Sequence, residues 1–269
     1  MQKNEVKDLT VGSPMKLILS FAIPMLFGFL FQQFYNMVDT MVVGQCLGVT
    51  SLAAVGSTTS IINTMVMFFN GTSIGASVII SRHYGAHDDK KLHLAVETTI
   101  MVTFLASILF TVLGIFLAPL MLRFMSTPDD VLESASVYLR IYFSGIAGLL
   151  VYNMGSAVLR AVGDTKRPLL FLCFSSILNT VLDLVFVLGL GMGVLGVALG
   201  TIISQAFSWL FGLFYINRRY PAIAIRPFSR RFDRALFRQI MGIGLPAGIQ
   251  MSLVCLLYTS RAHETRRHL

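Results

Sequence analysis

Long apolar runs separated by short polar segments make up most of the chain. A helix that crosses a bilayer needs about 20 mostly apolar residues, and each run is at least that long. Six runs are complete, and a seventh follows a basic segment. They cover residues 17–43, 52–80, 94–122, 137–159, 169–190, 194–216 and 235–257. The pattern predicts an all-α polytopic membrane protein with a six-helix lobe and a partial seventh transmembrane helix.

Glycine and proline mark two features of these predicted spans. The glycine-rich segment 189–193 predicts a tight turn between the fifth and sixth spans. Pro24 lies inside the first span, where proline removes a backbone hydrogen bond of the helix. We therefore expect a helix kink at Pro24.

Composition excludes an ordinary soluble protein. Hydrophobic residues make up 55% of the chain and charged residues 13%, and the mean hydropathy is +0.74. A soluble domain carries about 25% charged residues. Most of the 21 basic residues lie in the N-terminal tail and after the second, fourth and sixth spans. Since lysine and arginine concentrate on the cytoplasmic side, the N-terminus is predicted to be inside. The net charge of +8 therefore reflects membrane topology, and we expect no nucleic-acid partner.

The first and seventh spans begin in the same way. Pro24 and Pro246 each follow a short apolar stretch and lie eight positions after a basic residue. After six crossings the seventh span would repeat the orientation of the first, as in parallel-repeat transporters. The charged residues after 254 do not suit a span that should emerge outside, so this tail looks foreign to the rest. We divide the chain into a cytoplasmic N-terminal tail (1–16), a six-helix lobe (17–216), a basic cytoplasmic inter-lobe linker (217–234), the start of a second lobe (235–254) and a non-native tail (255–269).

Two carboxylates, Asp39 and Asp183, lie inside predicted spans. A carboxylate at the centre of a spanning helix costs about 2.5–3.5 kcal/mol on insertion scales. Each of the two therefore needs an interaction partner or a functional role. The span directions place both in the outer half of the bilayer, at one depth with Asn179 and Thr201. We expect these four residues to bind and couple a cation, because their oxygen atoms suit a proton or Na⁺. A purely structural pair of acids is the alternative.

Three further polar residues are candidates for accessory roles. Asn36 shares a helix face with Asp39, and Tyr138 begins the fourth span at the same depth. Asn153 lies further in along that span, where an interhelical hydrogen bond explains it as well as ligand contact does. No cysteine or histidine spacing indicates a metal site, so no metal is expected beyond Na⁺ at the Asp39/Asp183 pair.

Several motifs, in order along residues 10–254, resemble those of the multidrug and toxic compound extrusion (MATE) transporters. They are Pro24 with Val38-Asp39-Thr40 and Val43-Gly44, Tyr84 to Lys90, Leu159 to Lys166, Asn179 to Asp183, and Gly244-Leu245-Pro246. The resemblance implies two six-helix lobes around a central cavity that opens to one side at a time. It also implies antiport, in which a cation enters as an organic, often cationic, drug leaves.

The same resemblance assigns the four clustered residues named above to the cation site of the first lobe. It places Tyr138 and Asn153 near that site, and it implies that ion binding rearranges the first span about Pro24. The second lobe is absent from this sequence, so the chain would be an N-terminal fragment that needs the missing lobe for transport.

These inferences predict a cation-coupled (H⁺ or Na⁺) multidrug antiporter of the cytoplasmic membrane, not an enzyme. We expect no cofactor, and as partners lipophilic or cationic small molecules, membrane lipid and the missing lobe. Two alternatives stay open. A lipid-linked oligosaccharide flippase of the same superfamily would favour more basic residues in its cavity. A seven-helix receptor or sensor fits the number of spans but not the inside N-terminus or the repeat.

Overall fold

The computed structural model describes residues 13–125, 127–220, 223–225 and 232–267, with side chains as far as Leu257 except at residues 49 and 50. Most of the predicted N-terminal tail, parts of the predicted linker and the last two residues of the predicted foreign tail lie outside the described residues. The division of the chain into lobes, linker and tails stays a prediction.

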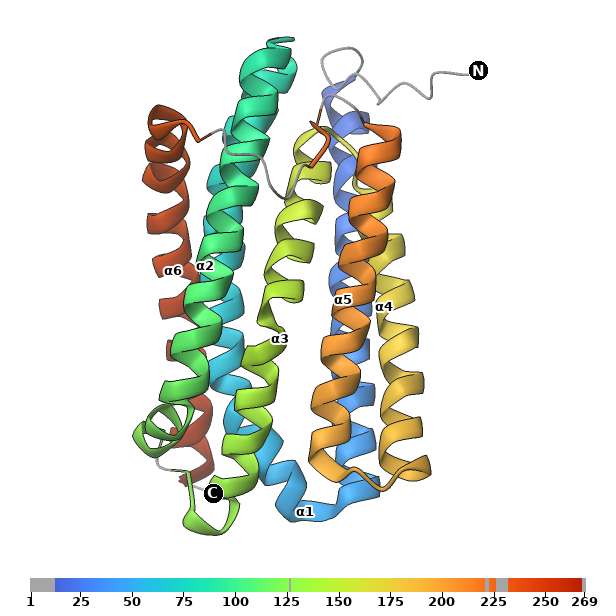
Figure 1. Cartoon of the computed structure of the whole chain (residues 1–269), viewed down its shortest axis with the longest axis vertical. Coiled ribbons are helices and arrows are strands. Elements are labelled where there is room, and N and C mark those ends of the chain that lie inside the picture. Colours follow the sequence, from blue (N-terminus) through green and yellow to red (C-terminus); the bar gives the residue numbers. More distant parts are fainter. Residues whose placement is uncertain (1–12, 126, 221–222, 226–231, 268–269) are drawn as a thin grey trace.

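Helices account for almost all of the described chain (Figure 1). They are α1 (Pro14–Gly85), α2 (Asp89–Phe124), α3 (Asp129–Ala161), α4 (Lys166–Leu184), the π-helical turn η1 (Val185–Gly189), α5 (Gly193–Arg219) and α6 (Arg234–Arg267). Within the described residues, 7 stretches are long and apolar enough to cross a membrane, two of them in α1. They match the seven predicted spans, which are thereby confirmed. The chain is a multi-pass membrane protein.

The first two predicted spans are two helices, which the label α1 covers together. α1 departs from helical dihedral angles at Gly48, with φ 80° and ψ −179°, and this residue divides it into Pro14–Gly48 and Ser51–Gly85. A positive φ is open to glycine because glycine lacks a Cβ. Figure 1 shows the resulting turn at the lower end of α1. Backbone angles at Pro24 stay helical, so the kink expected there is not the break that divides α1.

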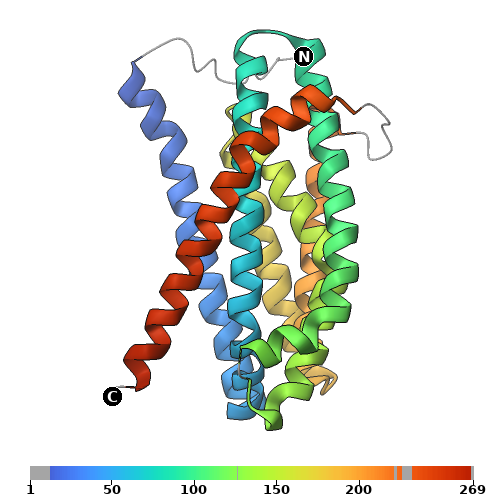
Figure 2. The same cartoon turned by 90° about the vertical axis from the view of Figure 1, so that its left-hand side faces the viewer.

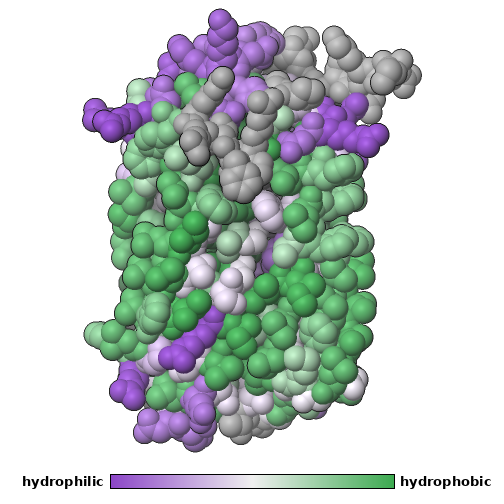
Figure 3. Space-filling view, viewed as in Figure 1, coloured by the Kyte–Doolittle hydropathy of each residue, from purple (hydrophilic) through white to green (hydrophobic). Residues whose placement is uncertain are grey.

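The helices stand side by side in a bundle, and α6 crosses it obliquely (Figure 1, Figure 2). The second half of α1 packs tightly against α6. A Cβ on Gly71 would overlap the backbone of Gly248, and one on Gly244 would lie 2.7 Å from the carbonyl oxygen of Thr72. Small residues let transmembrane helices approach this closely. Figure 3 shows a broad apolar belt between polar ends on one face, as a bilayer requires.

Short segments connect the two ends of α5 to the bundle. Gly191 and Gly193, with φ of 63° and 60°, form the predicted tight turn before α5. After α5, the N–H of Ile225 donates to Oδ1 of Asn217 (2.6 Å), and Nδ2 of Asn217 donates to the carbonyl oxygen of Ile225 (3.0 Å). Ile223 and Ile225 are buried, so this part of the predicted linker is packed onto the bundle.

Helix α6 covers both the predicted start of a second lobe and most of the predicted foreign tail. It runs from Arg234 to Arg267 as one helix, so the boundary predicted after residue 254 is not visible in its backbone. Asp233 caps the first turn, since its Oδ1 accepts from the N–H groups of Ala235 (2.8 Å) and Leu236 (2.9 Å).

Candidate cation-coupling site

The carboxyl groups of Asp39 of α1 and Asp183 of α4 lie close enough to interact directly. Asp183 is buried, with 1% of its surface exposed. Oδ1 of Asp39 is also buried, and it has no hydrogen-bond partner among the described residues. Two neighbouring carboxyl groups can share a proton, and like charges this close disfavour ionisation of both groups. The pair can therefore hold one proton between two helices.

Asn179 joins the carboxyl pair to α5. It lies one turn before Asp183 on α4 and is 2% exposed. Its Nδ2 lies 3.4 Å from both Oδ1 of Asp183 and Oγ1 of Thr201. With the amide turned over, Nδ2 donates to the Tyr35 hydroxyl (3.2 Å) and to Oδ2 of Asp183 (3.3 Å), while Oδ1 accepts from the Thr201 N–H (3.1 Å). Either orientation links α4 with α5, and the second also reaches α1 and satisfies more groups.

Tyr35 belongs to this cluster, although it is not among the site residues predicted from the sequence. It lies one turn before Asp39 on α1, and its side chain lies close to that of Thr201. Its spacing of four from Asp39 is the signal that could have identified it, because residues four apart share a helix face. The cluster therefore draws two side chains from α1.

Two of the predicted accessory residues lie apart from the carboxyl pair, and their accessory role stays a prediction. Asn36 is exposed, and its side chain hydrogen-bonds to Gln32 (3.2 Å) and Gln33 (3.4 Å) of α1. Nδ2 of Asn153 donates to the carbonyl oxygen of Leu149 (3.0 Å), one turn earlier in α3. Both side chains are thus satisfied within their own helix, and neither joins the carboxyl pair.

Tyr138 of α3 lies near the carboxyl pair. It is 4% exposed and lies close enough to Asp39 and Asp183 to interact with their charges. Its ring stacks on that of Tyr142, with centroids 6.4 Å apart and ring planes at 25°. The two tyrosines form an aromatic wall of the cluster.

The α4–α5 hairpin sets the remaining groups at one level. α4 ends directly after Asp183 and continues through η1 and the glycine turn into α5. Gly200, the residue before Thr201, is buried, and a Cβ there would overlap Oδ1 of Asp183. The missing side chain lets the carboxyl lie directly against α5. π-helical turns such as η1 are frequent beside functional sites.

The assembled groups suit a proton or a hard monovalent cation. Carboxyl, amide and hydroxyl groups supply oxygen atoms from α1, α4 and α5. Over the ranges that the structure describes, no group of three or more His, Cys, Asp or Glu is placed to hold a metal ion. The arrangement can change its charge by one unit while it links three helices.

The fold and its central residues define a polytopic membrane protein with a paired carboxyl site inside the helix bundle. The MatE family model matches residues 24–185. The chain belongs to this family, so the resemblance to MATE transporters in the sequence motifs is confirmed.

The chain is similar to proteins named for multidrug resistance and export. It is 35% identical over 248 residues to the probable multidrug resistance protein YpnP of Bacillus subtilis. The aligned region covers 92% of this chain and 55% of YpnP. It is 25% identical over 243 residues to the multidrug export protein MepA of Staphylococcus haemolyticus. That aligned region covers 90% of this chain and 54% of MepA. A crystal structure of MATE in complex with MaD3S matches with a TM-score of 0.84 at 28% identity, over 93% of this chain and 56% of that one. The chain spans about half the length of the curated relatives it matches.

Proposed function

We propose that this chain forms the first lobe of a cation-coupled multidrug antiporter in the cytoplasmic membrane, with its N-terminus inside. The observation that carries the proposal is the contact between Asp39 and Asp183 across α1 and α4. Family membership and the similarity to multidrug export proteins support a small-molecule substrate. The placement of the basic loops supports the orientation.

Charge at the carboxyl pair would control the position of α1. Two unit charges about 4 Å apart interact by about 4 kcal/mol in an effective dielectric of about 20. A proton or Na⁺ at the pair removes this repulsion and lets α1 lie against α4, and loss of the ion pushes α1 away. Pro24 gives α1 a point at which to bend, because a backbone hydrogen bond is missing there. Ion binding would thus be coupled to the shape of the lobe.

The same pair accounts for exchange of the ion with a substrate. An organic cation is attracted to the ionised pair and is disfavoured when H⁺ or Na⁺ neutralises it. Each ligand therefore lowers the affinity for the other by the same factor, as linkage requires. We place the opposite wall of the substrate cavity in a second lobe, because the chain covers 55% of YpnP and 54% of MepA.

Substitution of each carboxyl in the full-length gene product tests the proposal. Asp39→Asn and Asp183→Asn keep the side-chain size and remove the change of charge. We expect loss of drug resistance and of ion-driven ethidium efflux from membrane vesicles, with unchanged membrane expression. Asp129→Asn is the matched control, because this exposed aspartate lies in the first turn of α3, outside the cluster.

Efflux at the wild-type rate in both carboxyl mutants would contradict coupling at this site. Separate pH and Na⁺ gradients across the vesicles would identify the coupling ion, because only the coupled gradient should drive ethidium out in the wild type.

A further inference from the structure

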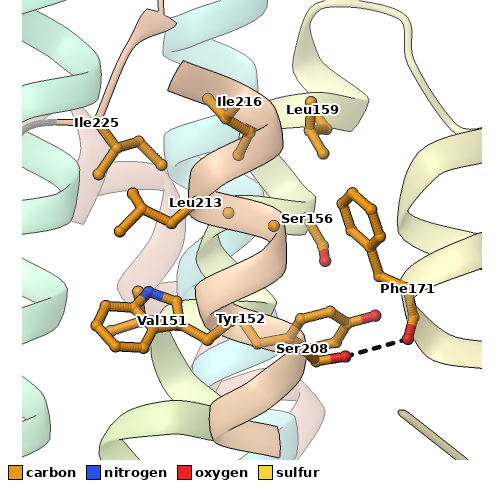
Figure 4. Close-up of a pocket in the computed structure, with 12 residues that line it drawn as sticks. Val151, Tyr152, Ser156, Leu159, Phe171, Ser208, Leu213, Ile216 and Ile225 are labelled. Carbon is orange, nitrogen blue, oxygen red and sulfur yellow. Dashed lines mark hydrogen bonds between the residues drawn. The ribbon is translucent and has the colours of Figure 1, made fainter. Parts of the chain in front are cut away.

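A small chamber lies between α3, α4 and α5, near the inner ends of these helices (Figure 4). Its volume is about 10 Å³, and its walls include Tyr152 and Ser156 of α3, Phe171 of α4 and Ser208 of α5. A cavity needs at least about 10–15 Å³ of such volume to hold a water molecule. The chamber therefore reaches the lower limit of the volume that one water molecule needs.

Three hydroxyl groups line the chamber, and one of them has an unused donor. Ser208 donates to the carbonyl oxygen of Phe171 (3.1 Å), and Tyr152 donates to that of Pro168 (3.2 Å). Ser156 is 4% exposed, and its hydroxyl lies near that of Tyr152 but makes no hydrogen bond of good geometry in the described part of the chain. A buried polar group without a partner is destabilising. Figure 4 shows the oxygens of Ser156, Tyr152 and Ser208 on the same side of the chamber, close to Phe171.

We propose that this chamber is a binding site for one water molecule. The Ser156 hydroxyl donates to the water oxygen. The water donates its two hydrogens to the hydroxyl oxygens of Tyr152 and Ser208, whose own hydrogens already go to backbone carbonyls. Buried waters make about three hydrogen bonds, so these three hydroxyls suffice and no existing bond has to break.

A line of buried polar groups connects the chamber with the carboxyl pair. Thr201, Ser204 and Ser208 occupy positions i, i+3 and i+7 of α5 and so share one face. Ser204 donates to the carbonyl oxygen of Thr201 (2.9 Å), and Ser175 of α4 donates to that of Ser204 (3.2 Å). We call Ser175, Thr201, Ser204 and Ser208 the polar seam, and its three serines are all buried. The water site lies at its inner end, about 10 Å along α5 from Thr201 at about 1.5 Å per residue.

The described part of the linker covers the chamber. Ile225 lines it and is 4% exposed, and Asn217 holds the Ile225 backbone through two hydrogen bonds. Displacement of Ile225 would therefore widen the chamber on that side. In the proposed antiporter the polar seam would be the inner part of the ion's route out of the site. That role rests on the proposed function, whereas water binding does not.

Hydroxyl-radical labelling by X-ray pulses, read by mass spectrometry, tests the water site. Radiolysis of a bound water labels the nearest side chains, so a buried residue beside a water is labelled and one in a dry site is not. Phe171 (5% exposed) lines the chamber, and Phe143 (1% exposed) lines a larger apolar groove between α1, α2, α3 and α6. In the 269-residue chain in lipid nanodiscs, Phe171 should be labelled severalfold faster than Phe143, because apolar cavities stay dry.

Substitutions at Ser156 then identify the source of the label. Ser156→Val fills the chamber and should lower the labelling rate of Phe171 to that of Phe143. Ser156→Ala removes only the hydroxyl and should also lower the rate, so the test survives if the valine variant fails to fold. Ser107→Ala is the matched control. This buried serine of α2 lies outside the chamber, and its hydroxyl donates to the carbonyl oxygen of Phe104 (2.7 Å).

Equal labelling of Phe171 and Phe143 in the wild type would overturn the water site. So would labelling of Phe171 that persists in both Ser156 variants. These readouts need no transport, so they are decided independently of the efflux experiment on Asp39 and Asp183.

Discussion

The carboxyl group of Asp183 lies directly against Gly200, where a Cβ would overlap Oδ1 of the aspartate. This contact brings α4 and α5 together at the level of Asn179 and Thr201. The geometry of the site therefore depends on an absent side chain as well as on the polar groups. A methyl group at position 200 displaces the carboxyl without removing any polar group of the cluster.

We expect Gly200→Ala to lower the free energy of unfolding by about 1–3 kcal/mol, as overpacking of a tight site usually does. In the full-length gene product it should also weaken ion-driven efflux, because Asp183 has to move away from Asn179. Thermal unfolding in detergent measures the first effect. Gly56→Ala is the control, since a Cβ there meets nothing within 4 Å. Equal stability of the two variants would contradict the contact.

Tyr35 and Asn36 should differ sharply although they are neighbours in sequence. Tyr35→Phe removes the hydroxyl that reaches Asn179 and Thr201. A hydrogen bond contributes about 0.5–1.5 kcal/mol, so the affinity for the coupling ion should fall by up to about tenfold. Asn36→Ala should have no effect, because this side chain is exposed. The ion dependence of efflux measures both, and a larger effect of Asn36→Ala would show that the cluster is wrongly assigned.

The contact between α1 and α6 should be sensitive to a single methyl group. A Cβ on Gly248 would lie 2.7 Å from the carbonyl oxygen of Phe68, so Gly248→Ala should destabilise the packing by about 1–3 kcal/mol. Disulfide formation between Cys255 and a cysteine introduced by Thr64→Cys measures this, because the present Oγ1 and Sγ atoms lie 4.0 Å apart. Gly248→Ala should lower the disulfide yield, whereas Gly242→Ala, with open space around it, should not.

Tyr220 should make the stability of the chain depend on pH in the alkaline range. Its hydroxyl donates to Oδ2 of Asp164 (2.7 Å) at the inner end of α5. Partial burial, then this hydrogen bond and the Asp164 charge, raise the pKa of Tyr220 above its usual value. The folded state thus holds the phenolic proton more tightly than the unfolded state. The resulting stability is complete below the unfolded pKa of about 10 and is lost as the pH rises through the folded pKa.

Tyr220→Phe should therefore lower stability at neutral pH by about 1 kcal/mol, the usual net value of one hydrogen bond. Above about pH 10 the wild type should lose this advantage, and the two unfolding curves should converge. Thermal unfolding of both proteins at a series of pH values checks this. Curves that stay parallel throughout would show that the phenol contributes no alkaline pH dependence.

Much of the site is visible in the sequence. Asp39 and Asp183 stand out because a carboxylate in an apolar run is costly wherever the helix faces. Asn179 follows from Asp183 because residues four apart share a helix face, and the structure places them 3.4 Å apart. Thr201 follows from its depth in the bilayer. These inferences use only distance along a helix, which the sequence specifies directly.

The rotation of each helix about its own axis, by contrast, is decided by packing and not by position along the sequence. Both Tyr35 and Asn36 are close to the face of Asp39, and the packing of α1 against α4 and α5 turns the tyrosine inward and the asparagine outward. The positive φ that places the break at Gly48, between the predicted spans 17–43 and 52–80, is also seen only in the structure. So is the close approach of Asp183 to Gly200.

Hydropathy along the chain thus specifies the membrane class, the number of spans and the depth of each polar residue, because burial in lipid depends on the sum over about 20 residues. The choice of partners for Asp39, Ser156 and Ile225 belongs to the folded bundle. Lipid-facing and core-facing positions of a transmembrane helix are both apolar, so periodicity does not mark which face is buried. Helix faces in a membrane are selected by close packing and interhelical hydrogen bonds, and both exist only once the helices meet.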